Sequence, residues 1–200
     1  MDQKTWLKKN CGTLAGKTVA VTGASGGLGS ELCRVILYCS GQLLLLNRSK
    51  EKTDCLTQAL LQEFPQGKIS FFSLDLEDMQ SVDAACSYLK ANVPDILLHN
   101  AGIYDVPRHL CSTKLDNVFQ VNFFAPYYMT RILLPELRLH RSHVAVVGSI
   151  AHTYSPSDPC DVDFHTRTHC HLTYGNSKRY LMFGLGQQSQ AIRISLEIIS

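Results

Sequence analysis

The sequence lacks long apolar runs, a secretory signal peptide and a strong charge of either sign. A membrane-spanning helix needs roughly 18–20 apolar residues, but the longest run, around Gln42–Leu46, has only the length of a strand. No apolar segment follows the lysines near the N-terminus, so a signal peptide is not expected. The net charge of +2 gives no reason to expect binding to nucleic acid or to an anionic membrane.

Paired cysteines are also missing, because the eight cysteines are scattered and none forms a CxxC motif. Several lie in apolar patterns, where a reduced cysteine behaves as a small hydrophobic residue. Without a secretory signal, this pattern indicates free thiols in a reducing compartment. We therefore expect a cytoplasmic protein without a membrane span.

Size and composition predict one globular domain. The 200 residues are 45% hydrophobic and 18% charged, which is enough apolar material for a substantial core. Residues 1–16 form a polar N-terminal extension, in which Trp6 and Leu7 either dock on the body or belong to a flexible tail. Residues 17–200 form the domain itself.

Strand-like and helix-like segments alternate along this domain. The predicted strands are Lys17–Thr22, Gln42–Asn47, Lys68–Leu74, Pro94–His99, His143–Ser149 and Ala191–Ile199. The predicted helices are Ser30–Ser40, Thr53–Phe64, Met79–Ala91, Lys114–Leu139 with breaks near Pro126 and Pro135, and Tyr174–Gln188. This order predicts an α/β fold, a doubly wound Rossmann-like parallel sheet of about six strands with helices on both faces. Ligands of such sheets bind at the carboxyl ends of the strands.

A glycine-rich turn, TGASGGLG at Thr22–Gly29, joins the first strand to the first helix. Gly23 permits a tight turn, Gly27 lets backbone N–H groups approach a pyrophosphate, and Gly29 lets the helix pack on the sheet. The helix N-terminus adds partial positive charge toward phosphates. The turn therefore predicts a dinucleotide site, to which its residues Ser25 and Leu28 also belong.

The residues after the second strand, Asn47-Arg48-Ser49, bear on the choice of cofactor. A site that prefers NAD usually has an acidic residue here to bind the ribose 2′-hydroxyl. This chain has none, and Arg48 is suited to a 2′-phosphate. The pattern favours NADP(H), with NAD as the alternative if Arg48 is only a solvated surface residue.

Tyr174 and Lys178 lie four residues apart in the run YGNSK, on one face of a predicted helix. A phenol is a poor base near neutral pH, but a nearby ammonium favours its ionised form. The pair is therefore a candidate acid/base centre, although this spacing alone also arises by chance.

Together these motifs resemble the short-chain dehydrogenase/reductase family from about Leu14 onward. The resemblance rests on TGASGGLG, Asp75-Leu76 after the third strand, HNAG at His99–Gly102, Asn122, Ser149 and YGNSK. It implies that Asp75 and Leu76 border the adenine and that Asn100, Ala101 and Gly102 form the cofactor-side loop. His99 stands where asparagine is commoner, and we interpret it as a structural histidine.

The resemblance also implies an oxidoreductase that moves a hydride between the nicotinamide and a carbonyl or alcohol substrate. Tyr174 would donate or accept the proton, and Lys178 would assist it and bind the nicotinamide ribose. Ser149 would hydrogen-bond the substrate oxygen, unless its hydroxyl serves only the local backbone. Asn122, which lies mid-helix where asparagine is not favoured, would hold a water near Lys178.

Ser149 and Tyr174 lie 25 positions apart, a long gap that resembles the retinol-dehydrogenase-like branch of the family. The gap is rich in metal-capable side chains: Cys160, Asp161, Asp163, His165, His169, Cys170 and His171. Their irregular spacing does not match a structural zinc site, so we expect a polar substrate-side loop and no metal.

The family pattern normally continues past the sixth strand, with which this chain ends. We therefore expect the chain to be a fragment of a longer protein or a naturally shortened form. The alternative function is that of a non-catalytic binding or regulatory protein. The expected partner is a small-molecule carbonyl or alcohol, with homo-oligomers possible through the exposed sheet edge.

Overall fold

The computed structural model describes residues 6, 7, 9, 11–158, 160–164, 169–187 and 193–197. Its centre is a parallel sheet with the strand order β3-β2-β1-β4-β5-β6. The strands are β1 (Thr18–Thr22), β2 (Gln42–Asn47), β3 (Ile69–Ser73), β4 (Ile96–His99), β5 (His143–Val147) and β6 (Arg193–Glu197). This order is that of a doubly wound sheet, which confirms the predicted fold class.

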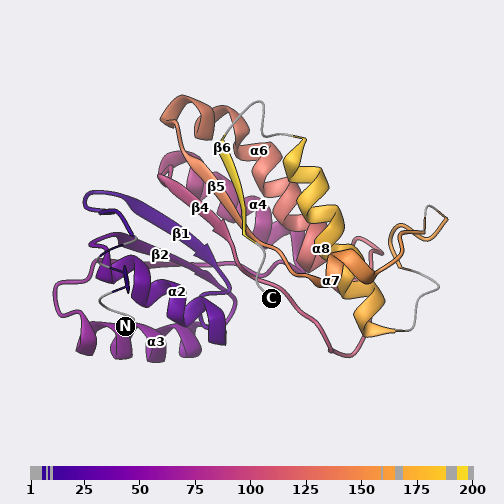
Figure 1. The fold of residues 1–200 in the computed structure, drawn as a ribbon, viewed down its shortest axis with the longest axis horizontal. Coiled ribbons are helices and arrows are strands. Elements are labelled where there is room, and N and C mark those ends of the chain that lie inside the picture. Colours follow the sequence, from indigo (N-terminus) through magenta and orange to yellow (C-terminus); the bar gives the residue numbers. More distant parts are fainter. Residues whose placement is uncertain are drawn as a thin grey trace.

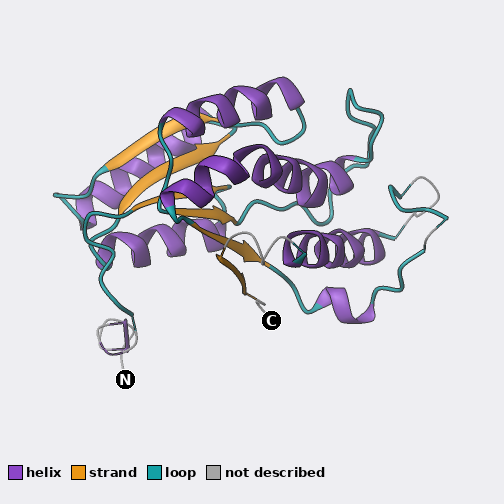
Figure 2. Ribbon diagram, turned by 90° about the horizontal axis from the view of Figure 1, so that it is seen from above, coloured by secondary structure: helices purple, strands orange, loops and turns teal. Residues whose placement is uncertain are grey.

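Helices cover both faces of the sheet (Figures 1 and 2). They are α2 (Gly27–Tyr38), α3 (Lys50–Glu63), α4 (Met79–Ala91), α5 (Asn117–Phe119), the π-helix η1 (Gln120–Phe124), α6 (Ala125–His140), α7 (Ala151–Tyr154) and α8 (Cys170–Gly186). Helices α2 and α3 lie on one side, and α4, α6 and α8 lie on the other.

Alternating strand residues divide the core into two apolar clusters, as the pleat of a strand requires. Val19 and Val21 face α2 and α3, where they pack with Cys33 and Leu60. Ala20, between them, faces the other side and belongs to the cluster that includes residues of α4, α6 and α8. Both clusters are nearly inaccessible to solvent, so the two helical layers are fixed relative to the carboxyl ends of the strands.

Capping residues explain where several helices begin. Helix α3 starts at Lys50, three residues earlier than predicted, because the Ser49 hydroxyl accepts a hydrogen bond from the backbone N–H of Lys52 at 3.2 Å. The Asp116 carboxylate caps α5 in the same way, at 2.9 Å from the N–H of Val118. Lys114 has a φ of 66° in the left-handed region, so the helix predicted from that residue begins only after Asp116.

The predicted break near Pro135 is wrong, whereas near Pro126 the helix does change character, from the π-helix η1 to the α-helix α6. Pro126 lies in the first turn of α6, where its missing N–H is tolerated, and α6 continues through Pro135 to His140. The irregularity lies just before them, in the π-helix η1, which contains Asn122. Helix α7 was not predicted, and α8 begins four residues before Tyr174, at Cys170.

Two further expectations have structural counterparts. All eight cysteines are free, as predicted. Leu7 in the N-terminal extension is buried, whereas Trp6 is about half exposed. Among the described helices, none combines the length and apolarity that crossing a membrane requires.

Candidate active site

A cavity of about 460 Å³ lies at the carboxyl ends of the strands. Every residue predicted to bind the cofactor lines it: Gly23, Ser25, Gly27, Leu28, Gly29, Asn47, Arg48, Asp75, Leu76, Asn100, Ala101, Gly102, Tyr174 and Lys178. Gly23 and Lys178, which are 155 positions apart in the chain, therefore share one cavity.

The glycines of the turn differ in what surrounds them. Gly23 has a φ of +65°, and a Cβ added there would lie 2.8 Å from the Ala101 Cα. A Cβ on Gly29 would lie 2.4 Å from the Gly23 carbonyl oxygen, so helix α2 approaches the turn too closely for any side chain. Gly27 instead faces open space on the cavity wall. The first two glycines allow the fold, and the third leaves room for a ligand.

Helix α2 presents its N-terminus to this cavity. Its N-cap residue is Gly26, so no side chain accepts a hydrogen bond from the N–H groups of the first turn. Gly26 through Gly29 all line the cavity wall. Uncapped N–H groups with partial positive charge are suited to binding a phosphate group.

The loop after β4 is tied to the glycine turn. The Asn100 side chain donates to the carbonyl oxygens of Thr22 and Gly23, at 2.9 and 3.0 Å. The Thr22 hydroxyl oxygen accepts from the backbone N–H groups of Asn100 and Ala101, at 3.1 and 3.0 Å. Asn100 thus holds the turn in shape as well as lining the cavity.

Charged side chains of both signs gather where β2 and β3 end. Arg48 is largely exposed, and one of its guanidinium nitrogens lies 3.8 Å from an Asp75 oxygen and 3.7 Å from a Glu77 oxygen. Lys52, in the first turn of α3, also lines the cavity and was missed by the sequence analysis. Its place soon after the second strand was the signal that could have revealed it, because ligands of such sheets bind at the carboxyl ends of the strands.

Lys178 is almost fully buried at the other end of the cavity, on α8. Its ammonium donates to the Val147 carbonyl oxygen at 3.0 Å and lies 5.7 Å from the centre of the Tyr174 ring. Burial lowers the pKa of Lys178 from 10.5 to about 8. The lysine therefore titrates close to neutral pH, beside the tyrosine with which it was paired on the sequence.

Asn122 and Ser149 do not line the cavity, although both were predicted to act there. Asn122 is fully buried, and its amide nitrogen donates to the Ile103 carbonyl oxygen at 2.8 Å and to the Ser177 hydroxyl at 3.0 Å. Its amide oxygen accepts from the Ile103 N–H at 2.8 Å. Both of its side-chain N–H donors are thus used within the protein, whereas its oxygen has a second lone pair with which to accept from a water.

Ser149 follows β5, and its hydroxyl oxygen accepts from the Ala151 N–H at 3.2 Å. This is the local backbone contact that the sequence left open as an alternative role. Because the hydroxyl acts here as an acceptor, its own O–H remains a donor.

The cavity wall also includes residues that the sequence analysis missed: Gly26, Leu46, Ser49, Lys52, Leu74, Glu77, Ile103, Tyr104, Val121 and Val147. Tyr104 packs edge-on against Tyr174, with 5.1 Å between ring centres, and its hydroxyl lies 3.0 Å from His171 Nδ1. This contact connects the predicted substrate-side loop to the cavity. His165 of that loop lies outside the described residues.

His99 is buried behind the site, and its Nε2 lies 2.9 Å from the Thr130 hydroxyl oxygen. That hydroxyl donates to the Pro126 carbonyl, so the histidine must carry its proton on Nε2. Burial, with a contribution from Lys178, lowers the pKa of His99 to about 4. These contacts agree with the structural role expected for it.

Residues 17–157 match the sequence model of the family described as short chain dehydrogenase. The chain belongs to the short-chain dehydrogenase family. Dehydrogenase/reductase SDR family member 13 of Bos taurus is 34% identical over 143 residues, which are 70% of this chain and 37% of that protein. The chain spans only between 35% and 60% of the lengths of the curated relatives compared.

Solved structures of other proteins share the fold. An uncharacterized protein from Mycobacterium paratuberculosis superposes with a TM-score of 0.81 at 24% identity, covering 95% of this chain and 70% of its own. A short-chain dehydrogenase from Sphingobium yanoikuyae in complex with NADPH has a TM-score of 0.73 at 18% identity, covering 92% of this chain and 71% of its own.

Proposed function

We propose that this site binds NADP(H) and catalyses hydride transfer between the nicotinamide and a small carbonyl or alcohol substrate. The observation that carries the proposal is the single cavity that joins the bare glycine turn to Tyr174 and Lys178. A dinucleotide needs such an elongated site, with phosphate-binding backbone at one end and proton-handling groups at the other.

The glycine turn and the N-terminus of α2 would hold the pyrophosphate. The turn has room for such a group at Gly27, because a Cβ added there would meet no protein atom within 4 Å. At Gly23 and Gly29, backbone atoms of the protein already occupy the space around the Cβ position. Asp75 and Leu76 would border the adenine, and Lys178 would bind the nicotinamide ribose. The cofactor supplies or accepts the hydride, and the chain supplies orientation and the proton.

Tyr174 would transfer the proton to or from the substrate oxygen. The buried Lys178 would provide the neighbouring positive charge when protonated. Ser149 would use its remaining O–H to donate to the substrate oxygen, where charge grows in the transition state. Asn122 would act as a positioning residue, because it clamps Ile103 of the cavity wall to α8.

The preference for NADP(H) over NAD(H) rests on Arg48 and Lys52, two cations on the cavity wall next to β2. Arg48 already faces Asp75 and Glu77, which compete with a 2′-phosphate for the guanidinium. The complex of the Sphingobium enzyme with NADPH is in line with the preference. A cytoplasmic location and a homo-oligomer remain predictions from the sequence, testable by cell fractionation and by light scattering.

Tyr174→Phe tests the proton-transfer role. We expect turnover with NADPH, assayed against a panel of aldehydes and ketones, to fall by at least about 100-fold, in the range of acid/base catalysis. The NADPH affinity, followed by cofactor fluorescence, should change little. Tyr154→Phe is the matched control, because Tyr154 is exposed and outside the cavity wall. If the Tyr174→Phe protein kept its turnover, the assignment would be wrong.

A further inference from the structure

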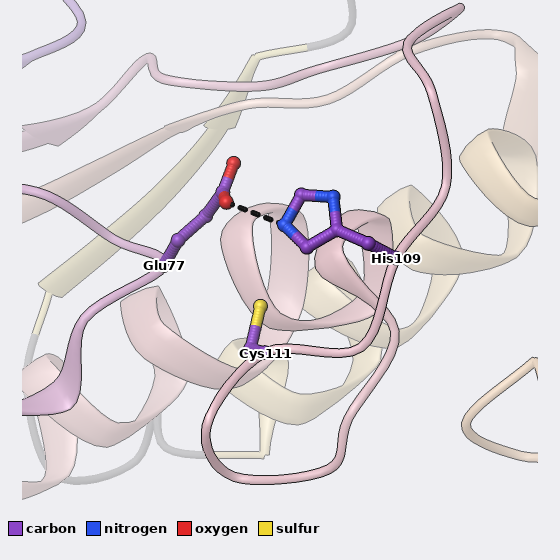
Figure 3. A group of neighbouring side chains, drawn as sticks. All are labelled: Glu77, His109 and Cys111. Atoms are coloured by element: carbon purple, nitrogen blue, oxygen red, sulfur yellow. Dashed lines mark hydrogen bonds and ion pairs between the residues drawn. The ribbon is translucent and has the colours of Figure 1, made fainter.

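Three metal-capable side chains meet beside the cavity, outside the set to which the proposed reaction assigns a role. They are Glu77, His109 and Cys111, and their ligand atoms all lie within 4.8 Å of one another. Figure 3 shows the Glu77 carboxylate and the His109 ring facing each other, with the Cys111 sulfur directed toward the space below them. His109 Nε2 lies 2.9 Å from Glu77 Oε2.

The chain path brings His109 and Cys111 to the same side. Leu110, between them, forms an isolated antiparallel bridge with Asp116, so the segment is extended at this point. Side chains two residues apart on an extended segment point in the same direction, and the one between them points away. Leu110 is accordingly 58% exposed.

Backbone hydrogen bonds fix all three positions. The His109 carbonyl oxygen accepts from the Asn117 N–H at 3.0 Å, and the Cys111 N–H donates to the Leu115 carbonyl at 2.9 Å. The Glu77 carbonyl oxygen accepts from the buried Gln120 side chain at 2.6 Å. Residues from two distant segments are thus held against each other before any ion binds.

The His109 ring faces hydrogen-bond acceptors on both nitrogens. Nδ1 lies 3.4 Å from the Pro107 carbonyl oxygen, and Nε2 faces the Glu77 carboxylate. A neutral imidazole has one N–H and cannot donate to both. A protonated ring satisfies both acceptors, and so does a neutral ring that binds a cation at Nε2 and donates its Nδ1–H to the carbonyl, an arrangement common among metal-bound histidines.

The Glu77 carboxylate can serve two partners at once. Its Oε1 lies 3.7 Å from Arg48, whereas Oε2 faces His109. A cation bound through Oε2 therefore leaves the contact with Arg48 in place.

We propose that Glu77, His109 and Cys111 bind a zinc ion, with water as the fourth ligand. A thiolate, an imidazole and a carboxylate form a donor set that suits Zn²⁺ and disfavours Mg²⁺ and Ca²⁺. Tetrahedral bonds of about 2.0–2.3 Å put ligand atoms roughly 3.3–3.8 Å apart. The longest separation in the cluster, at most 4.8 Å, therefore needs to shorten by up to about 1 Å, whereas His109 Nε2 and Glu77 Oε2, now 2.9 Å apart, need to separate slightly. Because Glu77 also lines the cavity, the ion would reduce the negative charge of its wall.

Cobalt substitution tests this site without any measurement of activity. The 200-residue chain, treated with a chelator and dialysed, is titrated with Co²⁺ and then with Zn²⁺. We expect one equivalent of Co²⁺ to give a thiolate charge-transfer band in the near ultraviolet and visible bands of a four-coordinate ion. One equivalent of Zn²⁺ should abolish both.

Three variants assign the ligands. Cys111→Ser should remove the charge-transfer band, and His109→Gln and Glu77→Gln should each weaken Co²⁺ binding at least about tenfold. The matched control is Cys170→Ser, because the Cys170 sulfur lies 3.7 Å from His171 Nδ1 and offers a competing pair. Circular dichroism checks the fold of each variant.

Three outcomes would overturn the proposal. They are the absence of saturable Co²⁺ binding by the unmodified chain, a charge-transfer band that survives Cys111→Ser, and a band that disappears in Cys170→Ser. Since His109 is exposed and Glu77 is only partly buried, their variants decide the question even if Cys111→Ser does not fold.

Discussion

At the glycine-turn end of the cavity the wall is mostly backbone, whereas at the Tyr174 end it consists of side chains held by long-range hydrogen bonds. Gly23 and Gly29 have their Cβ positions filled by neighbouring backbone, and Gly27 lies open. At the other end, Lys178 is hydrogen-bonded to the Val147 carbonyl oxygen. Behind the cavity wall, Asn122 is hydrogen-bonded to Ile103 and Ser177.

This difference separates two requirements of the proposed reaction. At the glycine-turn end, a phosphate needs only to approach the backbone closely and to meet uncapped N–H groups, both of which local conformation provides. At the Tyr174 end, proton transfer needs side chains held at fixed mutual positions away from water, which only the packed core provides. Substitutions should therefore act on folding and cofactor binding at the first end, and on charge and proton transfer at the second.

Two alanine substitutions in the turn should differ in their effect on stability. Gly23→Ala places a Cβ 2.8 Å from the Ala101 Cα at a φ of +65° and should lower the free energy of unfolding. We expect a loss of about 2–5 kcal/mol, from left-handed strain and overpacking together. Gly27→Ala should leave stability unchanged or slightly higher and weaken NADPH binding. Urea unfolding and a cofactor titration measure the two effects, and equal stability of both variants would contradict the comparison.

Lys178→Met should change how stability depends on pH. The folded chain loses the lysine proton near pH 8 and the unfolded chain near pH 10.5, so between these values the unfolded state binds more protons. The free energy of unfolding therefore rises with pH in this window, by up to about 3 kcal/mol. Urea unfolding at several pH values should show this rise in the unmodified chain and a smaller one in Lys178→Met. If the free energy of unfolding rose equally with pH in both proteins, Lys178 would not be desolvated in the folded state.

Arg48→Ala and Lys52→Ala, alone and combined, test whether these two cations favour NADPH over NADH. The double variant should weaken NADPH binding about tenfold more than NADH binding, which corresponds to about 1.4 kcal/mol. Arg48→Ala alone should have a smaller effect, because Asp75 and Glu77 already face its guanidinium. Lys50→Ala is the control, since Lys50 pairs with Asp54 outside the cavity. Equal losses for both cofactors would remove the reason to prefer NADP(H).

The sequence predicted the glycine-turn end more completely than the Tyr174 end, for a physical reason. Glycine spacing encodes a local backbone conformation, and each predicted glycine has the place in the turn that the pattern implies. By contrast, nothing near Asn122 in the sequence indicates that its amide clamps Ile103 to Ser177. Contacts between residues far apart in the chain depend on the packing of whole helices.

The same limit explains the other misses. The fold was predictable because apolar runs and turn residues alternate along the chain, and β2 and α4 lie within the bounds predicted for them. Helix α7 is a single turn with no periodic pattern, so the sequence did not reveal it. The cluster of Glu77, His109 and Cys111 joins the loop after β3 to an extended segment 32 residues later, a pairing that no local motif encodes.

The most direct test of the central claim is a fluorescence titration of NADPH with the folded 200-residue chain, repeated with Gly27→Ala. The proposed function predicts saturable binding at one site, weakened by Gly27→Ala in a protein that remains folded. Absence of binding by the folded chain, or binding that is unaffected by the substitution, would contradict the assignment of this cavity to the cofactor.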